Sequence, residues 1–307
     1  MKAFVFPGQG AQFVGMGKDL YENSALAKEL FEKANDILGY RITDIMFNGT
    51  DEDLRQTKVT QPAVFLHSVI SALCMGDDFK PEMTAGHSLG EFSALVAAGA
   101  LSFEDGLKLV YARAMAMQKA CEAQPSTMAA IIALSDEKVE EICEQVTAEG
   151  EVCVAANYNC PGQLSCAGAV EELDAFVDAV KAAGGRAVKL AVSGAFHTPF
   201  MAETTQALAA KLETMQVNAP ELTLYSNLTG GVYPSQKEQI IETVSKQASN
   251  SVRWENTIRN MAADGVNTFI EVGAGTTLSG LVKRTLTDVR VFNVCDMATL
   301  EETVKNI

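Results

Sequence analysis

Clustered basic residues are what this sequence most clearly lacks. Its 24 Lys and Arg residues are outnumbered by 39 Asp and Glu residues, which gives a formal net charge of −15 at pH 7. Binding to nucleic acid or to an anionic membrane surface depends on clustered Lys and Arg, so we expect neither partner. Long apolar runs are also missing, because no stretch approaches the roughly 18 apolar residues that a membrane span needs.

Paired cysteines are absent as well. The seven cysteines are scattered, odd in number and without a Cys-x-x-Cys pair. This pattern argues against a disulfide framework and a zinc site, and it favours reduced thiols in a cytoplasmic protein. With 48% apolar and 21% charged residues, the composition is that of a globular protein long enough for one large domain and a smaller companion.

A small subdomain is predicted at residues 128–193. Apolar residues at positions i, i+3, i+4 and i+7 predict two helices here, one beginning after Ser135 and the other ending at Gly184. Strand-like runs precede, separate and follow these helices, at 129–134, 152–156, 164–167 and 187–192. The order β-α-β-β-α-β is that of a ferredoxin-like subdomain.

Strands and helices alternate in the rest of the chain. Strand-like runs occur at 2–6, 83–85, 222–226, 268–272 and 289–293, and helices are expected at 24–38, 63–73, 91–98, 102–121 and 198–215. This alternation implies a largely parallel sheet. We therefore predict an α/β core formed by residues 1–127 and 194–307, with the ferredoxin-like subdomain inserted between the two segments.

The strongest chemical signal is Gly86-His87-Ser88-Leu89-Gly90, between a predicted strand and a predicted helix. The flanking glycines allow the tight turn that exposes a nucleophilic serine, and the following helix directs its positive end at the same place. The alternative is a turn in which Ser88 only caps the helix. The strand-turn-helix context favours a nucleophile.

A serine nucleophile needs a base, and the sequence has three histidines. His67 lies in an apolar run and is expected to be a hydrogen-bonded core residue. His87 precedes Ser88, and neighbours at a strand end point to opposite faces. His197 lies in a predicted loop, where functional residues concentrate, and is the best candidate. No Asp stands in an obvious catalytic loop between Ser88 and His197, so a dyad oriented by a backbone or amide oxygen fits better than a triad.

A second glycine-rich loop, FPGQGAQ at 6–12, follows the first strand. It begins like a dinucleotide-binding G-x-G-x-x-G motif, but Phe13 occupies the third glycine position, so we expect no dinucleotide site. Two interpretations stay open from the residues alone. The loop is either a tight turn, or its N–H groups complete an oxyanion hole together with the N–H of Leu89.

The chain resembles the malonyl-CoA:acyl carrier protein transacylase family. Seven motifs occur in the family's order and span nearly the whole chain: FPGQG at 6–10, TQPA at 60–63, GHSLG at 86–90, NYNCPGQ at 157–163, AFH at 195–197, VRW at 252–254 and EVG at 271–273. The family's fold is a hydrolase-like parallel-sheet core with a ferredoxin-like insert, which agrees with the layout predicted above.

The resemblance implies roles for particular residues. Ser88 matches the family's nucleophile and His197 its catalytic histidine, while Gln9 and Leu89 match the positions whose backbone amides form the oxyanion hole. Arg113 matches the arginine that pairs with the free carboxylate of the malonyl group, as a planar guanidinium can. Without the resemblance, a solvated arginine on a helix surface would be preferred.

Two further residues have expected roles, the first from the same resemblance and the second from its place beside His197. Gln247 matches the residue that orients the histidine through its backbone carbonyl. Phe196, beside the base, is expected to crowd the α-carbon of the acyl group and to favour malonyl over methylmalonyl.

The resemblance also implies substrates and partners. The expected substrates are malonyl-CoA and phosphopantetheinylated acyl carrier protein, in fatty acid biosynthesis, with no cofactor, no metal and a monomeric enzyme. Because acyl carrier proteins are acidic too, docking needs a local basic spot, for which Lys283 and Arg284 are the candidates. The alternatives are a trans-acting acyltransferase of a polyketide pathway, an acyl-thioester hydrolase, and a catalytically idle scaffold.

Overall fold

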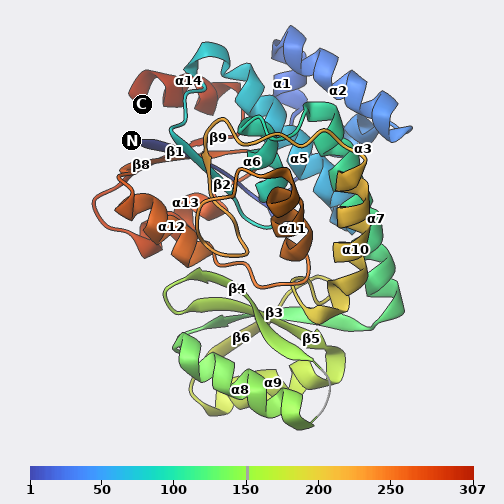
Figure 1. The fold of residues 1–307 in the computed structure, drawn as a ribbon, viewed down its shortest axis with the longest axis vertical. Helices are drawn as coiled ribbons and strands as arrows, with labels where there is room; N and C mark the ends of the chain where they lie inside the picture. Colours follow the sequence, from blue (N-terminus) through green and yellow to red (C-terminus); the bar gives the residue numbers. More distant parts are fainter. Residues whose placement is uncertain (150–151) are drawn as a thin grey trace.

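A five-stranded parallel sheet forms the centre of the large part of the molecule (Figure 1). The computed structural model describes residues 1–149 and 152–307, with side chains described except at 148 and 149. The strand order is β7-β2-β1-β8-β9, and every neighbouring pair is parallel. The strands are β1 (Lys2–Phe6), β2 (Met83–Gly86), β7 (Thr223–Leu224), β8 (Thr268–Val272) and β9 (Arg290–Val294).

Helices cover both faces of this sheet, as its sequence requires. In β1, Phe4 and Phe6 pack into one apolar cluster while Ala3 and Val5 pack into another on the opposite face. The first cluster includes residues of α2 (Ala25–Leu38), α5 (Thr57–Cys74), α6 (Gly90–Ala97) and α7 (Phe103–Ala123). The second includes residues of α12 (Trp254–Ala263) and α13 (Thr277–Thr285). A strand buried on both faces explains the continuous apolar run at residues 3–6.

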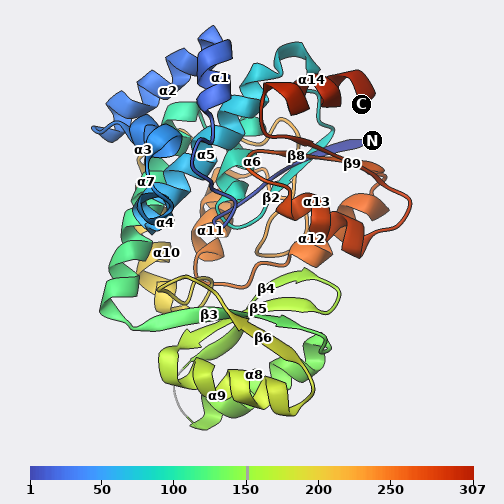
Figure 2. The same cartoon turned by 180° about the vertical axis from the view of Figure 1, so that it is seen from behind.

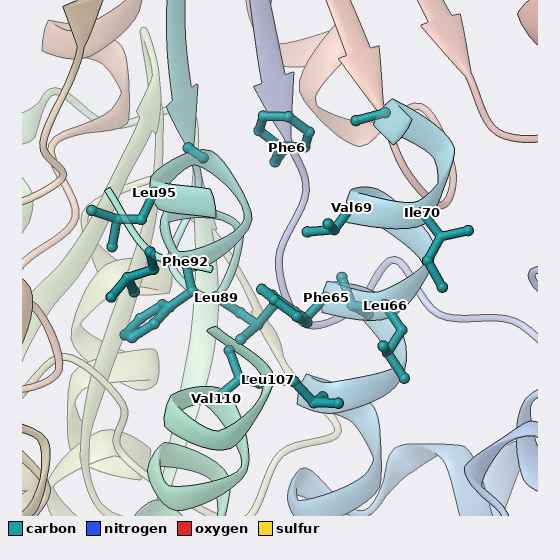
Figure 3. Packing of buried hydrophobic residues seen from close by; sticks show 14 of the residues in the cluster. Phe6, Phe65, Leu66, Val69, Ile70, Leu89, Phe92, Leu95, Leu107 and Val110 are labelled. Atoms are coloured by element: carbon teal, nitrogen blue, oxygen red, sulfur yellow. The ribbon is translucent and has the colours of Figure 1, made fainter. Parts of the chain in front are cut away.

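The first cluster fixes the position of α6 against the sheet. Figure 3 shows Phe65 of α5, Phe92 of α6 and Val110 of α7 converging below Phe6 at the end of β1. Full burial of a large apolar side chain stabilises the fold by about 1.5–3 kcal/mol. The helix that follows Ser88 is therefore held firmly by packing.

A four-stranded antiparallel sheet lies beyond the lower edge of the core in Figure 1. Its order is β4-β5-β3-β6, formed by β3 (Ser126–Ile132), β4 (Cys153–Cys160), β5 (Gln163–Ala169) and β6 (Arg186–Lys189). The helices α8 (Asp136–Glu149) and α9 (Val170–Ala182) cover the face turned away from the core (Figure 2). This connectivity and strand order confirm the predicted ferredoxin-like insert in an α/β core.

The other face of the small sheet contacts the large part. Met128, Ala156 and Ala167 of this sheet cluster with Met117 of α7 and with Phe196. The segment that contains His197 therefore lies where the two sheets meet.

Several predicted bounds differ from the structure. The predicted strand at 187–192 ends at Lys189, and the residues after it turn towards the core. The helix predicted at 63–73 begins at Thr57, so that Pro62 lies inside it. The helix predicted at 198–215 is a short 3-10 turn, Pro199–Met201, followed by α10 (Ala202–Glu213).

The remaining elements complete the large part. They are α1 (Lys18–Asn23), α3 (Ile42–Asn48), α4 (Asp51–Arg55), a 3-10 turn at Gly76–Asp78, α11 (Lys237–Gln247) and α14 (Met297–Asn306). Among the described residues, no helix is both long enough and apolar enough to span a bilayer.

Candidate active site

Ser88 lies in a sharp turn between β2 and α6. Its φ is 52°, in the left-handed region that costs energy for a residue with a β-carbon. The turn is tight enough that a β-carbon at Gly90 would overlap the carbonyl oxygen of Phe6 in β1. Such a turn exposes the serine hydroxyl at the carboxyl edge of a parallel sheet, in front of a helix N-terminus.

His197 contacts the serine directly. Its Nε2 lies 2.7 Å from Ser88 Oγ, and its Nδ1 lies 2.9 Å from the backbone carbonyl oxygen of Gln247. The imidazole is buried, and burial together with the positive charge of Arg113 lowers the pKa of His197 to about 3. The ring is therefore neutral at physiological pH. Since a carbonyl can only accept, Nδ1 holds the hydrogen and Nε2 is free to accept the serine proton.

Arg113 reaches the same hydroxyl from α7. It is 1% exposed, so the alternative of a solvated arginine on the helix surface is wrong. Its Nη1 donates to Gln61 Oε1 at 2.8 Å, and its Nη2 donates to Gln247 Oε1 at 3.1 Å and to Ser88 Oγ at 3.3 Å. Burial lowers the pKa of Arg113 only to about 10, so the guanidinium remains charged. No carboxylate of a described residue forms an ion pair with it, which leaves a buried cation beside the serine.

The two predicted oxyanion positions lie on neighbouring loops. A β-carbon at Gly8 would lie 2.5 Å from the carbonyl oxygen of His87 and 3.5 Å from the nitrogen of Leu89, so the loop after β1 passes directly over the serine turn. Gln9 lines a cavity together with Ser88 and His197. Within residues 1–149 and 152–307, neither the Gln9 N–H nor the Leu89 N–H donates a hydrogen bond. Both donors are therefore available to a ligand.

Asn227 is a functional residue that sequence reasoning missed. Its Oδ1 accepts from the Ser88 N–H at 2.6 Å, and its Nδ2 donates to the Gly86 carbonyl at 2.6 Å. These two bonds connect the two sides of the strained turn. Gln247 adds a third, because its Nε2 donates to the Ser88 carbonyl at 2.7 Å. No local pattern around Asn227 indicates this role, since it lies 139 residues from Ser88.

The prediction that His87 points away from Ser88 is wrong. The positive φ at Ser88 breaks strand alternation, and His87 lines the same cavity. Its ring is held by Asn159, whose Oδ1 lies 2.8 Å from Nε2, and by edge-to-face contact with Trp254. His87 is therefore a wall of the site with its own partner.

His67 is buried as predicted but lacks hydrogen bonds. It is 0% exposed on α5, and neither ring nitrogen has a hydrogen-bond partner among the described residues. The expectation of a satisfied core histidine is wrong in this respect.

A cavity of about 100 Å³ opens in front of Ser88. Its walls include the polar groups named above and five apolar side chains: Met117, Met128, Leu190, Val192 and Phe196. A second cavity of about 220 Å³ shares Gln9, His87, Asn157 and Leu190 with it. Amide and hydroxyl side chains of the small sheet line this second cavity: Asn157, Asn159, Gln163 and Ser165. Among the described residues, no group of three or more His, Cys, Asp or Glu side chains could hold a metal ion.

Of the basic pair Lys283 and Arg284, Arg284 contacts a residue that lines the second cavity. Both side chains are exposed at the end of α13, and Arg284 Nη1 donates to Gln163 Oε1 at 2.6 Å. Gln163 and Leu281 of α13 both line that cavity.

Comparisons with known proteins agree over the whole chain. A sequence model of the family described as acyl transferase domain matches residues 3–305. The malonyl CoA-acyl carrier protein transacylase of Bacillus subtilis is 38% identical over 307 residues, which cover 99% of this chain and 96% of that protein. The protein of the same name from Haemophilus influenzae is 40% identical, with 96% of each chain covered.

Solved structures give the same result. The acyl-carrier-protein-S-malonyltransferase of Bartonella henselae superposes with a TM-score of 0.94 at 37% identity, covering 99% of this chain and 98% of that one. A malonyl-transacylase solved in complex with a type II PKS acyl-carrier protein gives a TM-score of 0.96 at 35% identity, covering 100% and 99% of the two chains. The chain therefore belongs to the acyl transferase domain family and, within it, to the malonyl CoA-acyl carrier protein transacylases.

Proposed function

We propose that this enzyme transfers the malonyl group of malonyl-CoA to the phosphopantetheine thiol of acyl carrier protein, for fatty acid biosynthesis, through a malonyl ester of Ser88. One observation carries the proposal. Ser88 Oγ lies 2.7 Å from a neutral histidine nitrogen and 3.3 Å from a buried guanidinium that has no carboxylate partner among the described residues. A nucleophile, its base and an anchor for a carboxylated acyl group thus meet at one atom.

In the first half-reaction, His197 Nε2 takes the Ser88 proton as the oxygen attacks the thioester carbonyl. The N–H groups of Gln9 and Leu89 stabilise the oxyanion, for which one such donor is typically worth about 2.7–4 kcal/mol. The carbon–sulfur bond then breaks, and the imidazolium returns the proton to the departing coenzyme A sulfur. Arg113 binds the malonyl carboxylate throughout, and the Gln247 carbonyl stabilises the charged imidazole through Nδ1.

In the second half-reaction, the same groups act in the opposite direction. His197 takes the proton of the phosphopantetheine thiol, whose sulfur attacks the malonyl ester. The ester bond to Ser88 breaks, and the serine recovers its proton. Coenzyme A and acyl carrier protein present the same pantetheine arm. The amide-lined cavity of about 220 Å³ offers hydrogen-bond partners for the amide groups of this arm.

We assign the two parts of the chain different tasks. Residues 1–127 and 194–307 form the core that holds Ser88 and His197, and residues 128–193 form the subdomain that covers the site. The contact between the small sheet and Phe196 supports this division.

Lys283 and Arg284 are the proposed docking point for the acidic carrier protein. The contact of Arg284 with Gln163 supports this assignment, because a carrier bound there can insert its arm into the adjoining cavity. A monomer suffices for the reaction, because Ser88, His197 and Arg113 come from one chain. All seven cysteines are free thiols, which agrees with the cytoplasmic location we propose.

The test is intact-protein mass spectrometry after brief mixing with malonyl-CoA. The wild type should gain one malonyl increment, Ser88→Ala should gain none, and holo-acyl carrier protein should discharge the adduct and gain the malonyl group. Free malonate without transfer would show a hydrolase instead, and neither adduct nor turnover would show an idle fold or another acyl donor.

A matched variant tests the anchor. Arg113→Ala should lower kcat/KM for malonyl-CoA by about 100-fold, because two charge-assisted hydrogen bonds are worth about 3 kcal/mol or more. The rate of reaction with acetyl-CoA, which has no free carboxylate, should not fall. Equal losses for the two thioesters would contradict the role of Arg113.

A further inference from the structure

Glu91 is a buried carboxyl group that the proposed reaction does not use. It is the second residue of α6, directly behind the serine turn, and it is 1% exposed. Its Oε1 accepts from Tyr233 Oη at 2.5 Å and from the Asn227 N–H at 3.3 Å. Its Oε2 is buried without a hydrogen-bond partner among the described residues. One oxygen is thus fixed by donors, and the other is open to a proton.

Two titratable groups of neighbouring elements face this carboxyl: Arg113 of α7 and Tyr233, between β7 and α11. Burial raises the pKa of Glu91 to about 7, although the polar contacts of Tyr233, Gln247 and Asn227 and the charge of Arg113 oppose the rise. Burial and Glu91 itself raise the pKa of Tyr233, which stays protonated. The pKa values of His87 and His197 are both lowered by burial, so neither ring supplies a charge near pH 7.

The charges in this site change when the malonyl group arrives. Before loading, Glu91 is about half ionised near pH 7, and its ionised form is the buried anion that faces the Arg113 cation. After loading, the malonyl carboxylate is the second anion beside one cation, in surroundings where an uncompensated charge costs several kcal/mol. Protonation of Glu91 restores the balance.

We propose that Glu91 binds a proton, and so loses its negative charge, as the malonyl group is loaded. It releases that proton when the malonyl group leaves. This inference rests on the proposed pairing of the malonyl carboxylate with Arg113. Loading itself is neutral in protons, since the Ser88 proton ends on the coenzyme A sulfur as the C–O bond forms and the C–S bond breaks. The additional proton comes from solvent, binds Glu91 Oε2 and involves no oxidation or reduction.

Linkage makes this exchange measurable. If loading raises the proton affinity of Glu91, a lower pH must favour loading to the same extent. Near pH 7, about half of the Glu91 carboxyls are already protonated, so loading takes up at most about half a proton per active site.

The experiment measures proton uptake with an indicator dye in weakly buffered solution at pH 7, on mixing excess enzyme with malonyl-CoA. Coenzyme A alone supplies the baseline for binding of the phosphates. The malonyl adduct is measured by mass in the same samples. The wild type should take up a substantial fraction of half a proton per adduct formed.

Three variants sharpen the result. Glu91→Gln keeps an oxygen for Tyr233 and Asn227 and should form adduct without proton uptake. Tyr233→Phe removes a bond that lowers the pKa of Glu91, so the pH of maximal uptake should move upwards. Glu271→Gln removes another buried carboxyl, which is bound by Leu278 and Ser279 instead, and should leave the uptake unchanged.

The outcomes separate the two proposals. Adduct without proton uptake in the wild type, or undiminished uptake in Glu91→Gln, would overturn the inference and leave the proposed function standing. Failure to form any adduct would overturn the proposed function itself. If Glu91→Gln does not fold, the wild-type measurement and the shift in Tyr233→Phe still decide.

Discussion

The Nδ1 atom of His197 lies 2.9 Å from the backbone carbonyl oxygen of Gln247, and the side chain of the same glutamine binds Arg113 and the Ser88 carbonyl. One residue therefore holds the proposed base, His197, by its main chain and the proposed anchor, Arg113, by its side chain. No carboxylate of the chain hydrogen-bonds Nδ1 among the described residues, so the histidine is oriented by a group that side-chain substitution does not remove.

Substitution of Gln247 should therefore separate binding from chemistry. Gln247→Ala keeps the carbonyl and the orientation of His197, but it frees the Arg113 guanidinium. We expect KM for malonyl-CoA to rise about tenfold, as loss of a hydrogen bond to a charged group implies, with a smaller fall in kcat. Steady-state kinetics at pH 7 measure both constants.

Gln247→Glu is the contrasting variant. Its carboxylate would pair with Arg113 and compete with the malonyl group, so the rise in KM should exceed that of Gln247→Ala. A loss of kcat in Gln247→Ala as complete as that of His197→Ala would contradict the main-chain role.

The fold could be predicted from the sequence to a greater extent than the contacts that support the active site. β1 has the predicted bounds, and the helix predicted at 24–38 is α2 at Ala25–Leu38, because local patterns determine these features. The helix before Pro62 was missed, because proline normally disfavours the helix turn before it. Here the turn persists because Thr60 and Gln61 are fully buried and the Thr60 hydroxyl binds the Leu54 and Gln56 carbonyls.

The roles of Asn227 and Glu91 could not be predicted. Each acts on the serine turn through contacts that exist only when segments more than 130 residues apart meet. Arg113 shows the same limitation, since its surroundings on α7 indicate only a helix, and its burial beside Ser88 is a tertiary property. The family resemblance supplied Arg113 but neither Asn227 nor Glu91.

Phe196 should limit the size of the acyl group. It lines the cavity of about 100 Å³ together with Ser88 and Arg113. The wild type is expected to use malonyl-CoA in preference to methylmalonyl-CoA, by the 10- to 200-fold that about 1–3 kcal/mol per methyl group allows. Phe196→Ala should reduce this ratio, measured by competition between the two thioesters. Equal use of malonyl-CoA and methylmalonyl-CoA by the wild type would show that Phe196 does not select between them.

Charge reversal at Lys283 and Arg284 should act on the carrier protein alone. Lys283→Glu with Arg284→Glu places two negative charges where an acidic partner is proposed to dock. We expect KM for acyl carrier protein to rise and to become less sensitive to salt, with KM for malonyl-CoA little changed. Lys18→Glu, which makes the same change of charge on α1, is the control. An unchanged KM for the carrier protein would exclude this docking point.

His67 should make the fold sensitive to acid. Burial lowers the pKa of His67 to about 4, and the charge of the Asp296 carboxylate only partly opposes this effect. Because the unfolded chain binds the proton with a pKa near 6.5, stability is complete above that value and is lost as the pH falls below it. At pH 5 the loss from this one group is about 2 kcal/mol.

His67→Leu removes that penalty with little cost, because neither ring nitrogen has a hydrogen-bond partner among the described residues and α5 is apolar at this point. Urea unfolding gives the free energy of unfolding at pH 7.5 and at pH 5. The difference between these two pH values should be about 2 kcal/mol smaller in the variant than in the wild type. At pH 7.5 the variant should be as stable as the wild type or more so, since burying an unpaired polar ring is unfavourable. The same pH dependence in both proteins would mean that His67 is not the group that titrates.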